Sequence, residues 1–223
     1  MNAIPESDTL EDKTLADMGA PQDILDAAAK LITPEEKARM EAEAKAAAEM
    51  AEKERMAKRE ALQNALDTLR QQDAFKTSLK YVSRDSSDLE FTSVSLGPSL
   101  DDETLAKLGP VSSALVSLDV SRSSVTEPAL AAELPKMTSL RRLNLSQTEV
   151  GDGILGVVAS LDNLEYLNLY GTKVTDEGIL RLKTLGGLED LYLWESQVSE
   201  AGAKALKEEL PGLYVNLGTV ELK

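Results

Sequence analysis

Cysteine and histidine are both absent from this 223-residue sequence. Their absence excludes a disulfide framework, a CxxCH haem-attachment site, an ordinary zinc site and any nucleophile activated by histidine. Phosphate-binding glycine motifs and DxDxDG calcium loops are missing as well. We therefore predict a protein without metal, cofactor or small-molecule substrate, and not an enzyme.

Basic residues, aromatic residues and long apolar runs are scarce. The 24 basic side chains stand against 39 acidic ones, a formal net charge of −15, and such a charge repels nucleic acid and anionic lipid. The longest apolar runs, such as 154–158, are far shorter than the roughly 18 residues of a membrane span. The acidic N-terminus shows no apolar region of a signal peptide, which leaves open a cytosolic chain and a mature or trimmed form. We expect a protein partner, with neither nucleic-acid binding nor direct membrane insertion.

Leucine returns at a fixed interval in the second half of the chain. The copies are LVSLDVSRSSV from Leu115, LRRLNLSQTEV from Leu140, LEYLNLYGTKV from Leu164 and LEDLYLWESQV from Leu188. A degenerate copy starts at Phe91, and a half-copy closes the array at 213–217. The spacing of about 24 residues is that of leucine-rich repeats. We predict an α/β fold: a leucine-rich-repeat solenoid, with a parallel concave sheet backed by helices, preceded by a long charged α-helix.

One column of the repeats carries hydroxyl side chains after the last strand leucine, where many leucine-rich repeats have Asn or Cys. A hydroxyl both donates and accepts, so we predict a buried structural ladder that links adjacent turns. A nucleophilic role would need a base, which a sequence without histidine does not supply. The column consists of Ser99, Ser123, Thr148, Thr172 and Ser196.

Outward-facing strand positions form the usual binding face of such a solenoid. Most of the Tyr and Trp residues gather on two neighbouring repeats, and Tyr170 and Trp194 share a column, so we expect them to stack. Two alternatives stay open: the rings only stiffen the sheet, or they stack against sugars. The residues predicted to bind a partner are Arg142, Asn144, Tyr166, Asn168, Tyr170, Asp190, Tyr192 and Trp194.

The first 82 residues carry no repeat. We divide them into a partly ordered segment, 1–32, and a segment, 33–82, that holds a long charged helix and an N-terminal cap for the repeat domain, 83–223. Thr33-Pro34-Glu35-Glu36 is a capping box that predicts the start of the helix. Large apolar residues between 38 and 58 are too sparse for sustained heptads, which favours a solvated spacer over a coiled coil. The cap is predicted from an apolar stripe made of Leu62, Leu66, Leu69, Phe75, Leu79 and Val82.

The last repeats resemble the C-terminal repeat region of the c-type cytochrome domain-containing proteins, large envelope proteins of planctomycetes and verrucomicrobia. The segments that carry the resemblance are LEYLNLYGTKVTDEGI, LEDLYLWESQVSEAGAKAL and ELPGLYVNLG. In that family a haem-binding domain precedes the repeats, and a chain without Cys or His cannot hold the haem motif. The resemblance implies a periplasmic or envelope location, with the cytoplasm as the alternative, and a module that recognises a partner in a membrane or redox complex.

The sequence thus favours a non-catalytic interaction or structural subunit that binds a protein through its concave face. The alternative is an oligomerising scaffold that acts through the charged helix. The abundant carboxylates do not predict a metal site, because Asp152 and Asp176 stand where helices begin and acids are preferred.

Overall fold

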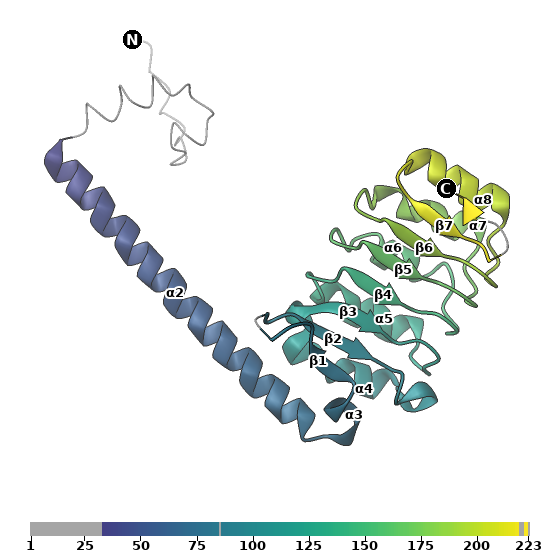
Figure 1. The fold of residues 1–223 in the computed structure, drawn as a ribbon, viewed down its shortest axis with the longest axis horizontal. Coiled ribbons are helices and arrows are strands. Elements are labelled where there is room, and N and C mark those ends of the chain that lie inside the picture. The colour runs from purple at the N-terminus through teal and green to yellow at the C-terminus, as the bar shows by residue number, and fades with distance from the viewer. Residues whose placement is uncertain (1–32, 85, 219–220, 223) are drawn as a thin grey trace, which may run out of the picture. The chain divides into compact units, whose positions relative to one another are not determined.

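A computed structural model describes residues 33–84, 86–218 and 221–222 of the chain (Figure 1). The chain forms two units, one that ends at Ala57 and one that runs from Lys58 to Lys223. The predicted segment 1–32 lies outside the described residues. The boundary predicted at residue 82 falls within the second unit, in the connection between two paired strands.

The charged helix α2 (Pro34–Arg70) begins where the capping box predicts. The Thr33 hydroxyl accepts the N–H of Glu36 at 3.2 Å, and the Glu36 carboxylate accepts the N–H of Thr33 at 2.9 Å. Every side chain from residue 34 to residue 61 is exposed. Exposed ion pairs lie along this part of the helix: Arg39–Glu43, Lys45–Glu49 and Arg55–Glu52. Over these residues α2 is therefore a solvated rod.

The last turns of α2 belong to the second unit, and most of the apolar stripe from which the cap is predicted is buried in its core. Leu66 and Leu69 are buried there, together with Phe75 of the short helix α3 (Asp73–Lys76) and Leu79 of strand β1 (Leu79–Tyr81). The prediction was wrong for Val82, which is 52% exposed. A strand turns successive side chains to opposite faces, so Leu79 points into the core and the residues at 80 and 82 point away from it.

A single eight-stranded sheet runs through the second unit in the order β1 to β8. Strands β2 to β7 pair in parallel, and one antiparallel strand closes each end. The register places four buried residues in one row across successive strands: Leu143, Leu167, Leu191 and Val215. The fold is thus the predicted leucine-rich-repeat solenoid. The remaining strands are β2 (Leu89–Thr92), β3 (Leu115–Asp119), β4 (Arg142–Asn144), β5 (Tyr166–Asn168), β6 (Asp190–Tyr192), β7 (Tyr214–Asn216) and β8 (Glu221–Leu222).

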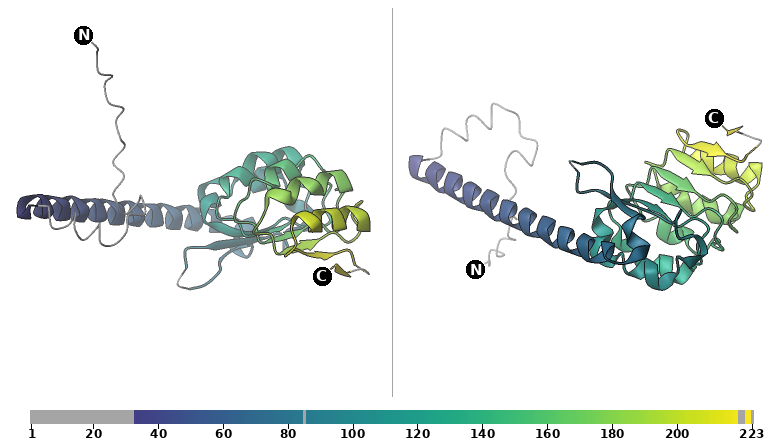
Figure 2. Two further views of the ribbon diagram at one scale, coloured as in Figure 1. Left: turned by 90° about the horizontal axis from the view of Figure 1, so that it is seen from above. Right: turned by 60° about the horizontal axis from the view of Figure 1, so that its bottom comes forward.

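Short helices cover one face of the sheet and leave the other open (Figure 2). Their leucines and the strand leucines form one continuous core. We call the uncovered side the open face. The helical segments are η1 (Gly97–Ser99), α4 (Asp102–Ala106), η2 (Gly109–Ala114), α5 (Glu127–Glu133), η3 (Leu134–Lys136), α6 (Leu155–Val158), α7 (Asp176–Ile179), η4 (Leu180–Thr184) and α8 (Glu200–Glu209).

Carboxylates at or shortly before the helices connect successive repeats. The prediction that Asp152 stands at a helix start was wrong, because α6 begins only at Leu155 and has no acid in its first turn. Asp152 accepts the N–H and the hydroxyl of Thr175, the residue that precedes α7 in the next repeat, at 2.8 and 2.6 Å. Gly178 leaves room for this carboxylate, which a Cβ at that position would overlap. The same bridge joins Asp102 to Thr126 and Asp176 to Ser199. These acids therefore hold neighbouring repeats together.

The hydroxyl column is structural in a different way from the one predicted. The hydroxyls of its last three members donate to a carbonyl of their own repeat and do not link adjacent turns. A hydroxyl that bonds back over three residues closes the turn after the strand, because it satisfies a carbonyl at the strand's end. The three bonds, each 2.6 Å long, are Thr148 to Leu145, Thr172 to Leu169 and Ser196 to Leu193.

Ser99 does not belong to this column. It is exposed at the end of η1, because the first repeat has a longer turn. Leu100, the next buried leucine, comes nine positions after Phe91, whereas Val125 comes seven positions after Leu118 in the second repeat. Ser123 is half-buried and its hydroxyl accepts the N–H of Val125 at 3.4 Å.

Candidate partner-binding surface

Six of the eight residues predicted to bind a partner lie in strands on the open face, and Tyr170 and Trp194 lie in the turns that follow β5 and β6. Arg142, Tyr166 and Asp190 are neighbours in one row across β4, β5 and β6, and Asn144, Asn168 and Tyr192 form the next row. All are half-buried or exposed, whereas the leucines between them are buried. The period of two along each strand thus separates the core from the open face.

Five aromatic rings on and beside the open face form two contacting groups: a ladder of three rings across β5, β6 and β7, and a stacked pair in the turns that follow β5 and β6. The ring centroids of Tyr166 and Tyr192 are 5.3 Å apart, and those of Tyr192 and Tyr214 are 6.2 Å apart. Tyr170 and Trp194 stack, as predicted, with centroids 5.2 Å apart and planes inclined by 23°. We call these five residues the aromatic surface.

Tyr214 was missed among the candidate residues. It occupies, in the closing half-copy LYVNL, the position that Tyr166 has in LEYLNL. The signal was present in the repeat alignment, but the half-copy lacks most of the repeat. The structure shows that this strand completes the sheet and carries the ring ladder one repeat further.

Trp194 is the most accessible ring of the aromatic surface, with 50% of the residue exposed. One side of it packs on Tyr170, and its indole also lies against Gly218, where a Cβ would overlap the ring. A hydrogen bond to the Glu195 carboxylate raises the pKa of the Tyr170 hydroxyl. The indole is thus fixed by packing while half of its surface remains accessible to a partner.

Tyr192 replaces a residue that other repeats use to close a turn. In Asn144 and Asn168 the side-chain oxygen accepts the backbone N–H two residues further on, at 3.0 and 2.9 Å. Asn216 forms the same bond at 2.7 Å. Tyr192 has no such oxygen and instead contacts two rings, and burial, followed by the charge of Asp190, raises its pKa. The predicted Asn residues are therefore partly structural.

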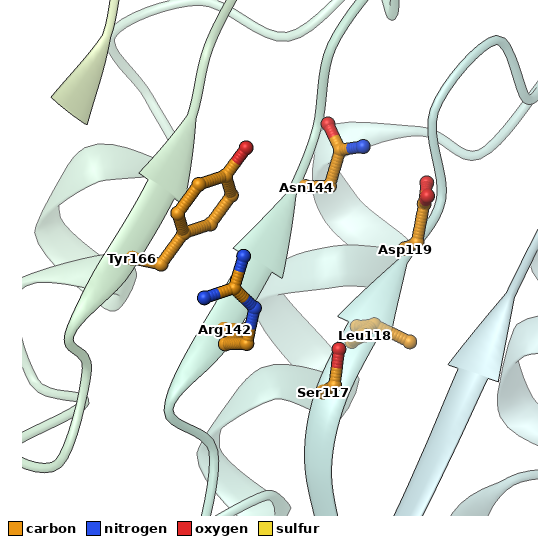
Figure 3. A pocket seen from close by; sticks show the side chains of 6 residues that line it. All are labelled: Ser117, Leu118, Asp119, Arg142, Asn144 and Tyr166. Atoms are coloured by element: carbon orange, nitrogen blue, oxygen red, sulfur yellow. The ribbon is translucent and has the colours of Figure 1, made fainter. Parts of the chain in front are cut away.

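Arg142 lies at one end of the ring ladder. Its guanidinium sits over the Tyr166 ring, 4.1 Å from the centroid. Beside it is a pocket of about 130 Å³ on the open face, between β3, β4 and β5 (Figure 3). The pocket is lined by Ser117, Leu118, Asp119, Arg142, Asn144 and Tyr166.

No family model and no curated protein matches the chain. Similar solved structures include a leucine-rich-repeat protein of Leptospira interrogans, 15% identical over 49% of this chain with a TM-score of 0.38. Two internalins of Listeria monocytogenes also match: InlF, 19% identical over 49% of the chain with a TM-score of 0.35, and InlC2, 16% identical over 58% with a TM-score of 0.29. This chain spans 33%, 36% and 69% of the length of these three proteins. The repeat fold itself rests on the strand register and the shared leucine core.

Among the described residues, no three acidic side chains are grouped so that they could hold a metal ion. No helix in the same part of the chain has the length and apolar character needed to cross a membrane.

Proposed function

We propose that this chain is a non-catalytic interaction subunit that binds a protein partner through the aromatic surface. The observation that supports the proposal is a ladder of three contacting rings across β5, β6 and β7 with a stacked Tyr–Trp pair beside it, on a face that no helix of the described residues covers. Tyr, Trp and Arg are the side chains that most often dominate the binding energy of protein interfaces. The aromatic surface presents all three types, because Arg142 adjoins it.

The aromatic surface offers a partner a large rigid area at low entropic cost. Trp194 and Tyr170 hold each other in place before binding, so fewer rotamers are lost when a partner covers them. The same stacking also stiffens the sheet. The two roles are separable, because a stiffening role alone would lower the stability of Tyr170→Ala and Trp194→Ala variants without changing which proteins the folded variants bind.

The test compares proteins that co-purify with three forms of the full chain from the cells that make it, identified by mass spectrometry. The Tyr170→Ala/Trp194→Ala variant is expected to lose its partner by tenfold or more, since hot-spot rings each contribute more than about 1 kcal/mol. The matched control, Val94→Ala/Leu180→Ala, replaces two exposed apolar residues outside the aromatic surface and is expected to retain the partner. Folding of each variant is checked by circular dichroism.

The scaffold alternative predicts the opposite pattern, with binding lost when residues 34–57 are deleted and kept in the aromatic variant. The exposed methionines of α2 do not favour it. At about 100° per residue, Met50 is turned by about 80° from Met40 and Met56 by about 120° from Met50, so they share no stripe. Dependence of binding on residues 34–57 alone would replace the present proposal by the scaffold.

The cellular setting and the absence of catalysis are also parts of the proposal. A periplasmic or envelope location, and a partner in a membrane or redox complex, are supported by the resemblance of the last repeats alone. Fractionation of the native cells tests the location. Enzymatic activity that survives purification and disappears when a single carboxylate is replaced would contradict a purely non-catalytic role.

A further inference from the structure

Hydrogen-bond donors are grouped on the part of the open face around Arg142, although the chain as a whole carries a net charge of −15. The side-chain oxygens of Asn144 and Asn168 are already occupied by backbone N–H groups. Their NH2 groups, which can only donate, are the ends left to face outward. The Tyr166 hydroxyl accepts from Asn168 Nδ2 at 3.5 Å, so its own hydrogen is available to a ligand. A group bound here must therefore supply acceptors.

Arg142 provides the positive charge of this region. Among the described residues, no carboxylate lies within ion-pair distance of it, whereas its neighbour Arg141 pairs with Glu165 at 2.9 Å. Its guanidinium is instead held over the Tyr166 ring. Contact with the ring face restrains the guanidinium and uses none of its N–H donors, which remain available to a ligand.

The pocket brings these donors into one row. Ser117 and Tyr166 flank Arg142 in the register of β3, β4 and β5, and Figure 3 shows the three side chains rising beside one another. Asp119, the one carboxylate of the lining, lies two residues further along β3 and accepts the N–H of Ser121 at 2.9 Å. Within the pocket, this row therefore offers a positive charge and two hydroxyls. The carboxylates of the same row, Glu90 on β2 and Asp190 on β6, are outside the pocket lining, one on either side.

We infer that this pocket binds the carboxylate of an Asp or Glu side chain in an extended segment of the partner. The inference rests on the proposed function and adds the chemistry of one contact: the acid pairs with Arg142 while adjoining residues of the segment cover the aromatic surface. A carboxylate can accept two parallel N–H groups from one guanidinium, which a neutral amide cannot match. The pocket lies in mid-sheet, with β2 on one side and β6 and β7 on the other. A chain can run past it in both directions, which favours a side chain over a chain terminus.

The test titrates the full chain with three short probes: N-acetyl-Glu-Tyr-amide, N-acetyl-Gln-Tyr-amide, and N-acetyl-Gln-Tyr with a free terminal carboxylate. Binding is followed in ¹H–¹⁵N spectra through the arginine Nε–Hε signals. The Glu probe is expected to bind about tenfold more tightly than the Gln amide and to shift the Arg142 signal most. Arg142→Gln removes this preference, Arg142→Lys keeps part of it because the charge remains without the fork, and the matched control Arg141→Gln leaves it intact.

Three outcomes overturn the inference. The Glu and Gln amides bind equally, or the preference persists in Arg142→Gln, or no probe shifts the Arg142 signal at millimolar concentration. Tighter binding of the probe with the free terminus would overturn the choice of a side chain. Each result leaves the proposed function to be judged by the Tyr170→Ala/Trp194→Ala variant, in which Arg142 is unchanged.

Discussion

Asp152 acts on two repeats at once. The sequence alone suggests that Asp152 offsets the partial positive charge of exposed backbone amides at a helix start, but α6 begins three residues later. In the structure Asp152 accepts the N–H and the hydroxyl of Thr175 in the next repeat, and Gly178 provides the space. Because a substitution at either partner changes the environment of the other, Asp152 and Gly178 form one coupled unit.

This coupling gives the first stability prediction. Asp152→Ala is expected to lower the free energy of unfolding by about 1–3 kcal/mol, because it leaves the Thr175 N–H and hydroxyl without their acceptor. Gly178→Ala is expected to cost about 1–3 kcal/mol by overlap with the carboxylate. Urea denaturation should give a double variant less destabilised than the sum of the two, since alanine at 152 removes the overlap.

The control is Asp162→Ala, at an exposed acid that is expected to change stability by no more than about 0.5 kcal/mol. Additive effects of Asp152→Ala and Gly178→Ala would show that the bridge and the glycine are independent.

At the residue scale, the sequence predicted which strand residues face outward. It did not predict the hydrogen bonds that these residues form. The period of two assigns Asn144 and Asn168 to the open face, and the structure agrees. Their bonds to the N–H two residues on depend on how the turn folds, which a strand pattern does not contain. The prediction for Ser99 was wrong for a related reason: the turn of the first repeat is two residues longer than that of the next repeat, so Ser99 does not lie in the hydroxyl column.

At the scale of elements, two ordinary patterns predicted most of the N-terminal part. The capping box marked the start of α2, and the apolar stripe marked the cap, where Leu66, Leu69, Phe75 and Leu79 are buried. Val82 was assigned to the same apolar stripe, although it directly follows strand β1, where the chain is already extended. A helical period carried past the end of a helix selects the wrong face, because a strand repeats every two residues.

The exposed part of α2 should contribute nothing to the stability of the repeats. Deletion of residues 34–57 is expected to leave the free energy of unfolding of the second unit within about 0.5 kcal/mol of the full chain, because these side chains are all exposed. Deletion of residues 34–69 removes Leu66 and Leu69 as well and is expected to cost several kcal/mol. Urea denaturation followed by Trp194 fluorescence measures both. A large loss of stability in the shorter deletion would mean that α2 supports the repeats before residue 58.

At the scale of the whole second unit, its repeats touch only their neighbours in the sheet, from β1 at one end to β8 at the other. In such an array each repeat is stabilised by the faces that it shares with the next, and a cap covers the leucines of the first. The shared core is continuous from Leu66 to Val215. Loss of the cap should therefore lower the stability of distant repeats, provided that the interfaces are strong enough for the array to unfold as one.

The position of the single tryptophan allows this cooperativity to be measured. Leu66→Ala opens a cavity in the cap and is expected to cost about 2–5 kcal/mol. Trp194 lies beside β6, several repeats away from that cavity along the sheet, so its fluorescence reports the far end of the array. We expect the urea midpoint seen by Trp194 to fall in Leu66→Ala and to stay unchanged in Val82→Ala, whose side chain is exposed. An unmoved Trp194 transition in Leu66→Ala would show that the C-terminal repeats unfold independently of the cap, and that the aromatic surface needs only its own neighbouring repeats to keep its shape.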